Sequence, residues 1–176
     1  LVASFEADGT TTTGGNNNVA IGKSAAYGLK TGNDNFIIGN SAGYSNRRSG
    51  QNVMIGSESG KHFYEADANG NGGRNVGIGY KAYYNGDSGT VANNTGYKNI
   101  AIGYQALGNG HSTAFTAYEN VAIGHNVMNY GGNMVSSVAI GSTAGLYATG
   151  SYNTFVGAEA GKGGTTSAPY SSGQYN

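Results

Sequence analysis

The sequence of 176 residues has no cysteine, no tryptophan and one proline, and only 10% of its residues are charged. Without cysteine, the chain can form neither disulfides nor a cysteine-based metal site. Nine basic residues balance nine acidic ones without a basic cluster, which argues against nucleic-acid binding because such binding depends on neutralising phosphates. No apolar run approaches the ~20 residues of a membrane-spanning helix. We therefore expect neither a nucleic-acid partner nor membrane insertion of this segment.

Glycine and tyrosine are abundant, with 33 and 14 residues respectively. The glycines do not recur at every third position, which excludes a collagen triple helix. Many of them belong instead to a repeated five-residue motif, Asn or Ser followed by three mostly apolar residues and Gly, which we call the box. The box occurs at Asn18–Gly22, Asn35–Gly39, Asn52–Gly56, Asn75–Gly79, Asn99–Gly103, Asn120–Gly124, Ser137–Gly141 and Asn153–Gly157.

The spacing of the boxes predicts a repeat architecture. Successive box glycines are separated by 17, 17, 23, 24, 21, 17 and 16 residues. A small or apolar residue follows each of them by three positions, at Ala25, Ala42, Ser59, Ala82, Ala106, Val127, Ala144 and Ala160. Units of this size bury a continuous core only by stacking on one another. We therefore predict an all-β solenoid of about eight rungs over residues 16–161, with a basic rung of 17 residues.

Each box is typical of a short strand between two turns. Val, Ile and Phe favour strands, while Asn and Gly tolerate the left-handed backbone that a tight corner requires. Side chains alternate between the two faces of a strand, so Ala20 points away from Val19 and Ile21. Both faces are apolar, which indicates that both are buried.

A narrow coil of this length encloses only one of the two apolar faces. We expect identical copies packed side by side to cover the other face, because closed homo-oligomers are the usual way to bury such a surface. The alternative is a broader monomeric solenoid whose own core is sufficient.

The stretch Asn18-Val-Ala-Ile-Gly-Lys-Ser-Ala25 resembles the head repeat of the YadA-like trimeric autotransporter adhesins, and similar repeats occur in phage tail fibres and related bacterial surface fibres. The resemblance covers roughly residues 16–161. It implies a left-handed parallel β-roll, a homotrimer about one axis, and a role in attachment. The rungs are longer and less regular here than in the compact adhesin repeat. Because the first residue is Leu1 rather than Met, we expect a piece of a longer fibre.

The three long spacings predict a binding patch. Their extra residues fall in consecutive rungs, at about 61–73, 84–96 and 108–118, and insertions of adjacent rungs form neighbouring surface loops. Aromatic rings beside short polar side chains suit glycan or protein surfaces. The alternative is that these loops only cover the edge of the roll. The candidate ligand-binding residues are His62, Phe63, Tyr64, Glu65, Tyr83, Tyr84, Asp87, His111, Phe115 and Tyr118.

A calcium motif lies within the first insertion. Asp67, Asn69 and Asn71 match the opening of a calcium-binding loop, whose oxygen ligands alternate along the chain. The twelfth position is Ile78 instead of a bidentate glutamate, which excludes an EF-hand and leaves a looser calcium site as an alternative to no cofactor at all.

Catalysis has little support in the sequence. The three histidines fall in three different rungs, so a zinc site would depend on an accident of stacking, and no nucleophile motif is present. Glu65, Asp67 and Asp87 could form a glycoside-cleaving carboxylate pair, but nothing in the sequence fixes their separation. We therefore predict that the protein is not an enzyme.

The two ends lack the box. Residues 1–15 begin with a candidate strand at Leu1–Phe5 and continue as a linker or cap, and residues 162–176 form a second cap or linker. The sequence thus predicts a trimeric extracellular or virion fibre that attaches to a cell-surface glycan or protein, the alternative being a purely structural shaft.

Overall fold

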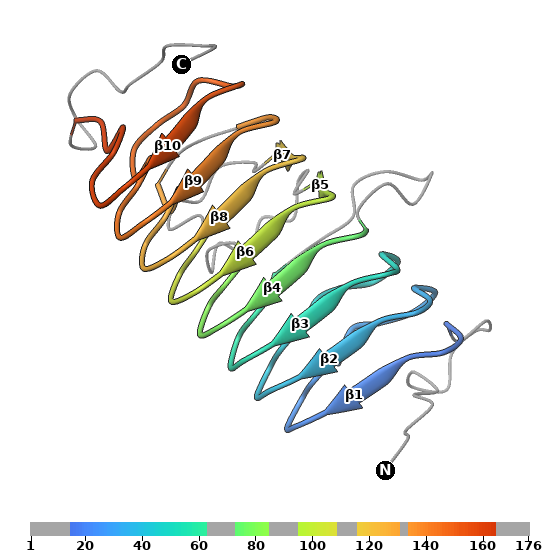
Figure 1. Ribbon diagram of the computed structural model, residues 1–176. Coiled ribbons are helices and arrows are strands. Elements are labelled where there is room, and N and C mark those ends of the chain that lie inside the picture. Colours follow the sequence, from blue (N-terminus) through green and yellow to red (C-terminus); the bar gives the residue numbers. More distant parts are fainter. Residues whose placement is uncertain (1–14, 63–72, 85–94, 109–115, 131–133, 165–176) are drawn as a thin grey trace.

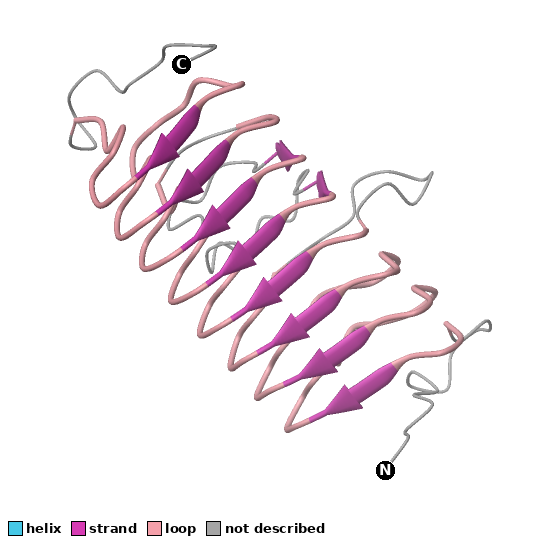
Figure 2. Ribbon diagram, in the orientation of Figure 1, coloured by secondary structure: helices cyan, strands magenta, loops and turns pink. Residues whose placement is uncertain are grey.

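The computed structural model describes residues 15–62, 73–84, 95–108, 116–130 and 134–164. Within them the chain is an all-β solenoid without helices, in which parallel strands stack along one direction (Figure 1, Figure 2). The predicted all-β parallel solenoid is therefore confirmed. Its handedness and the trimer stay predictions, and so do eight complete rungs, since four of the connections between boxes lie partly outside the described residues.

Every box forms a three-residue strand of one parallel sheet, in the order β1-β2-β3-β4-β6-β8-β9-β10. Equivalent residues pair in register, as in Ala20 with Ile37 and Ile37 with Met54. Each box position therefore forms a column along the solenoid. The strands are β1 (Val19–Ile21), β2 (Phe36–Ile38), β3 (Val53–Ile55), β4 (Val76–Ile78), β6 (Ile100–Ile102), β8 (Val121–Ile123), β9 (Val138–Ile140) and β10 (Thr154–Val156).

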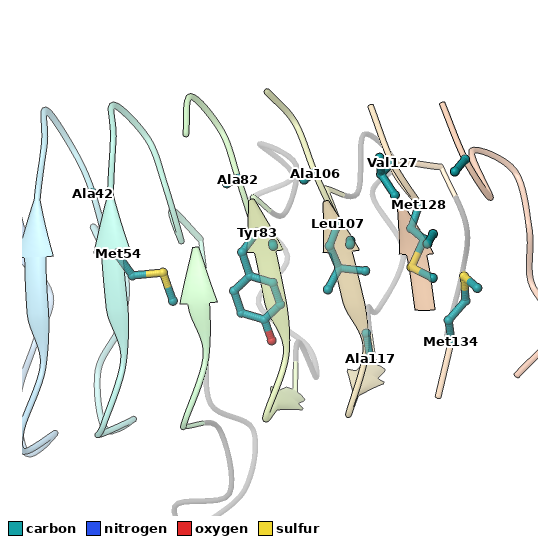
Figure 3. Packing of buried hydrophobic residues seen from close by; sticks show 14 of the residues in the cluster. Ala42, Met54, Ala82, Tyr83, Ala106, Leu107, Ala117, Val127, Met128 and Met134 are labelled. Carbon is teal, nitrogen blue, oxygen red and sulfur yellow. The ribbon is translucent and has the colours of Figure 1, made fainter. Parts of the chain in front are cut away.

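The middle residue of each strand from β2 to β10 in this sheet points into a buried core. Ile37, Ala101 and Ala122 are completely buried, as are most of the small residues three positions after the box glycines. Larger side chains such as Met54, Tyr83 and Leu107 fill the interior between them (Figure 3). The core is thus a single narrow row of side chains that runs along the solenoid. Because each turn encloses little space, many of the core residues are alanines.

Core residues of different size compensate for each other within a turn. The two positions compared are the middle strand residue and the residue four positions after the box glycine. In six of the eight turns a larger side chain at one place accompanies a smaller residue at the other, whereas the first and seventh turns have small residues at both. A Cβ on Gly60 would approach Met54 Sδ to 2.6 Å, and a Cβ on Gly77 would lie 3.3 Å from Tyr83 Cβ. The pairs are Ala20 with Ala26, Ile37 with Gly43, Met54 with Gly60, Gly77 with Tyr83, Ala101 with Leu107, Ala122 with Met128, Ala139 with Gly145 and Phe155 with Gly161.

The two flanking residues of each strand point outward. They form two apolar columns, broken only by Thr154, that run along the whole sheet. All of them are partly or fully exposed, from the half-buried Val53 to Val156 at 67%. We call this surface the apolar face. Of the two faces that the sequence predicts to be buried, the chain itself buries only the inner one.

The box asparagines form a buried hydrogen-bonded ladder. The Oδ1 atom of each asparagine accepts from the backbone N–H and the Nδ2 of the asparagine one turn on, as Asn75 Oδ1 does from Asn99 at 3.0 and 3.2 Å. Its Nδ2 also donates to a carbonyl, for example that of Gly96 at 3.1 Å. The asparagine ladder runs from Asn18 to Asn120, whose Oδ1 accepts from Ser137 N–H. Ser137 continues it by one step, since its Oγ accepts from Asn153 N–H at 3.1 Å.

The ladder corrects the sequence-based interpretation of the box asparagines. They do not adopt the left-handed backbone expected of them. That conformation, with φ of 49–65°, belongs to the residue before each box: Asn17, Asp34, Gln51, Arg74, Lys98, Glu119, Ser136 and Tyr152. The box glycines do have positive φ, between 121° and 140°, which confirms their predicted role as corners.

A second, short parallel sheet pairs β5 (Thr95–Tyr97) with β7 (Thr116–Tyr118). Both strands lie at the ends of the second and third insertions, which the sequence predicts to be loops. They precede β6 and β8 directly, so the insertions return to the stacked coil before the next box begins.

Replacing Asn75 by Ala tests the ladder. The change removes both donors and the acceptor of one step, leaving Asn99 N–H and Gly96 C=O buried without these partners. We expect the free energy of unfolding to fall by about 3–5 kcal/mol, measured by urea denaturation. The matched change Asn40→Ala, at an exposed asparagine outside the ladder, should cost less than ~0.5 kcal/mol. Equal losses in the two variants would contradict a structural role for the ladder.

Alanine substitutions at two box glycines distinguish the effect of backbone strain from that of crowding between turns. Gly79 has φ +129°, and a Cβ there would collide with the carbonyl oxygen of Gly103 on the next turn, whereas Gly157 has φ +121° and nothing within 4 Å. Both alanine variants carry a strain of ~1–2 kcal/mol, but only Gly79→Ala also pushes two turns apart. We expect it to destabilise the fold by at least ~2 kcal/mol more than Gly157→Ala in urea denaturation. Similar losses would show that φ alone matters.

Candidate functional site

The described residues include four of the ten predicted ligand-binding residues: His62, Tyr83, Tyr84 and Tyr118. The predicted patch therefore stays a prediction as a whole. Phe63, Tyr64, Glu65, Asp87, His111 and Phe115 lie outside the described residues, as do the calcium candidates Asp67, Asn69 and Asn71.

Tyr83 belongs to the interior. Its side chain is 1% exposed, and its hydroxyl accepts a hydrogen bond from Asn99 Nδ2 at 3.0 Å. Burial raises the pKa of this phenol well above its usual value, against the smaller opposing effect of Asn99. A side chain in this position supports the core and the asparagine ladder rather than presenting a surface to a ligand.

Tyr84 and His62 meet where the first insertion joins the solenoid. Their rings pack edge to face with centroids 5.9 Å apart, and Lys81 Nζ lies 4.8 Å from the centroid of the Tyr84 ring. Burial lowers the pKa of Lys81, but Glu58 and Tyr80 together outweigh it, so the pKa is raised overall. Lys81 also pairs with Glu58 at 3.5 Å. The structure thus brings together two predicted aromatic residues and an ion pair that the sequence analysis did not identify.

Tyr118 lies one turn further along than Tyr97, and the two rings stack with centroids 5.1 Å apart and planes 3° from parallel. The residues that follow them form an ion pair, Lys98 Nζ to Glu119 Oε1, at 3.0 Å. Lys98 lowers the pKa of the exposed Glu119 carboxyl, chiefly through this hydrogen bond.

Other aromatic residues also stack from one turn to the next. Tyr104 lies between Tyr80 and His125, at 5.3 and 5.1 Å respectively. Because the rings cover each other's faces, they present mainly their edges to solvent, and a sugar could reach only the two outermost faces. Two further stacks join Tyr27 with Tyr44 and Tyr130 with Tyr147.

A polar groove of about 480 Å³ lies on the turns that precede β2, β3, β4 and β6. Its lining includes Asp34, Arg48, Arg74, Tyr97 and Lys98, together with main chain of Gly50 and Gly73. The sequence analysis missed this site. Two features of the sequence could have indicated it. A basic residue, Arg74 or Lys98, directly precedes each of two successive boxes, and glycine stands two positions before the box at Gly50 and Gly73.

The described residues show no other arrangement that points to chemistry. Among them, no three histidine, aspartate or glutamate side chains gather where they could hold a metal ion. Nor does this part of the chain contain a helix of the length and hydrophobicity needed to cross a bilayer.

Comparison with known proteins adds no assignment: neither the protein-family models nor the curated proteins nor the solved structures include a match to this chain.

Proposed function

We propose that this protein is a non-enzymatic attachment module of an extracellular or virion fibre. It forms a side-by-side homotrimer, and its insertions bind a cell-surface glycan or protein. The observation that carries the proposal is the apolar face, two columns of mostly Val and Ile that the chain itself leaves in contact with solvent.

The apolar face is too regular to be scattered surface hydrophobicity. Its exposed members recur at fixed positions: Ile21 and Ile140 are third in their strands, while Phe36 and Ile100 are first. Half-buried Val and Ile residues continue both columns between them. Contiguous apolar patches of this kind mark interaction surfaces. The face carries no charged side chain, so a partner is held by apolar contact rather than by ion pairs.

A second copy of the chain matches this face best. The strand spacing repeats along the sheet, so the ridges of one copy fit the columns of another over the full length of the solenoid. Closed symmetry buries such a surface in every copy. The number three comes from the resemblance to the trimeric adhesin heads, and symmetry would present each insertion three times, which strengthens weak binding through avidity.

A structural shaft is the second candidate. It is favoured by the buried position of Tyr83 and by the stacking of Tyr118 on Tyr97, since both show predicted ligand-binding aromatics in packing roles. In that case the insertions only cover the solenoid, and recognition belongs to other parts of the fibre.

A charge on the apolar face tests the oligomer. We expect the protein to elute at about three times its mass of 17.8 kDa in size-exclusion chromatography with light scattering. Ile55→Glu together with Ile78→Glu should dissociate it, because two carboxylates would be buried unpaired in each interface. The control Asn40→Glu, on an exposed turn, should leave the mass unchanged. A wild-type protein that is a clean monomer would contradict the proposal.

Shortening the insertions tests attachment. Spacings of 23, 24 and 21 residues between the box glycines can each be reduced to 17, the length of the regular repeats. We expect the shortened protein to keep its oligomeric mass and to lose binding to cells or to a glycan array. Undiminished binding by an intact oligomer would place recognition elsewhere, and absence of binding by the wild type would favour the shaft.

A further inference from the structure

We propose that the polar groove before β2, β3, β4 and β6 binds a short anionic oligosaccharide, one that bears a carboxylate or a sulfate. This inference deepens the proposed attachment function by naming a ligand class. It rests on a surface distinct from both the predicted insertion patch and the apolar face.

The groove exists because one column of side chains is interrupted. The residues two positions before the boxes are Asn33, Gly50, Gly73 and Tyr97 on four successive turns. The two glycines are required because the turns approach closely: a Cβ on Gly50 would lie 2.6 Å from the carbonyl oxygen of Asn33. The consequence is a slot with a main-chain floor, bounded by Asn33 at one end and Tyr97 at the other. From the strand spacing it is about 14 Å long.

One face of the Tyr97 ring is directed along this slot. Tyr118 covers the opposite face, with the two planes 3° from parallel. On the groove side the preceding turn has Gly73 at the equivalent position, so no side chain of that column covers the ring, and Lys98 Nζ lies 5.6 Å from the ring centroid. An aromatic face at the end of a polar slot is a surface on which the C–H groups of a sugar ring pack. This distinguishes Tyr97 from Tyr104, whose two faces are both covered.

Positive charge is concentrated along the rim. Arg74 and Lys98 occupy the same position on adjacent turns, and Arg48 also lines the groove. Arg74 Nε donates to Gln51 Oε1 at 3.1 Å, which orients the guanidinium and leaves its other N–H groups as donors. Lys98 Nζ already pairs with Glu119 at 3.0 Å. By contrast, the described residues show no ion pair for Arg48 or Arg74, so these two guanidinium groups supply the charge that an anion in the groove would neutralise. A guanidinium binds a carboxylate or sulfate through two parallel hydrogen bonds.

The other end of the groove favours a sugar over an acidic peptide. Asp34, held by Asn17 Nδ2 at 3.0 Å, lines the groove next to Asn33 and Thr31. The side chains of Thr31, Asn33 and Asp34 can accept hydrogen bonds from sugar hydroxyls, and those of Thr31 and Asn33 can also donate to them. The Asp34 carboxylate would repel a second anionic group of the ligand. The lining offers no apolar pocket for peptide side chains. A ligand with hydroxyls at one end and a single acidic group at the other matches this order of residues.

The experiment measures binding of 3′-sialyllactose, a sulfated chondroitin tetrasaccharide and neutral lactose by isothermal titration calorimetry. We expect at least one of the two anionic sugars to bind at least tenfold more tightly than lactose. Arg48→Gln and Arg74→Gln should each weaken that binding about fivefold. The control Lys23→Gln, which removes the same charge from an exposed residue at the other end of a strand, should change it less than twofold. Circular dichroism and thermal unfolding check that each variant is folded.

Several results would overturn the inference. These are no binding of either anionic sugar, equal binding of lactose, or unchanged binding by the folded Arg48→Gln and Arg74→Gln variants. A hexa-aspartate peptide that binds as tightly as the sugars would also overturn it, because the groove would then select negative charge alone. None of these results affects the light-scattering or loop-shortening experiments, so failure of the groove is distinguishable from failure of the attachment function.

Discussion

The asparagine ladder is the constraint on which the rest of this solenoid depends. Each step joins one turn to the next through a backbone N–H and a side-chain amide, with both partners buried. A buried carboxamide is stable only when its donors and acceptor are satisfied, so the chain must return to the same place on every turn. The length of the chain between two successive boxes is much less constrained. The spacing of box glycines accordingly ranges from 16 to 24 residues while the strands keep one register.

The ladder also accounts for one part of the unusual backbone, the left-handed residues directly before the boxes. Residues such as Gln51, Arg74 and Glu119 adopt the left-handed conformation directly before a box, at a cost of ~1 kcal/mol or more each for a side chain with a Cβ. In return, their N–H groups reach carbonyls of the preceding turn, as Gln51 N–H does to Asn33 at 2.8 Å. The strain is therefore offset by pairing between turns. Glycine is obligatory where two turns also touch, as at Gly79 against Gly103.

The sequence predicted the features that need the same residue on every turn, but not the compensation in size between core residues of one turn. Identical boxes predict strands, parallel stacking and glycine corners, because those features need the same residue on every turn. The compensation between Met54 and Gly60, or between Gly77 and Tyr83, is visible only when two positions of one repeat are compared. Tyr83 illustrates a related point: it occupies a core column that Leu107 and Met128 continue, so its position in the repeat, rather than its aromatic ring, determines its environment.

Columns that the ladder does not use are free to carry surface chemistry, and the groove shows how little is needed to make a site on them. A side chain repeated on every turn covers the one beside it, as in the stack of Tyr104 with Tyr80 and His125. A face becomes accessible only where the repetition stops. Gly50 and Gly73 interrupt one column next to Tyr97, and all three residues line the groove together with Arg74 and Lys98 of the neighbouring column. In a repeat protein of this kind, the places to look for binding are therefore the irregular positions of otherwise regular columns.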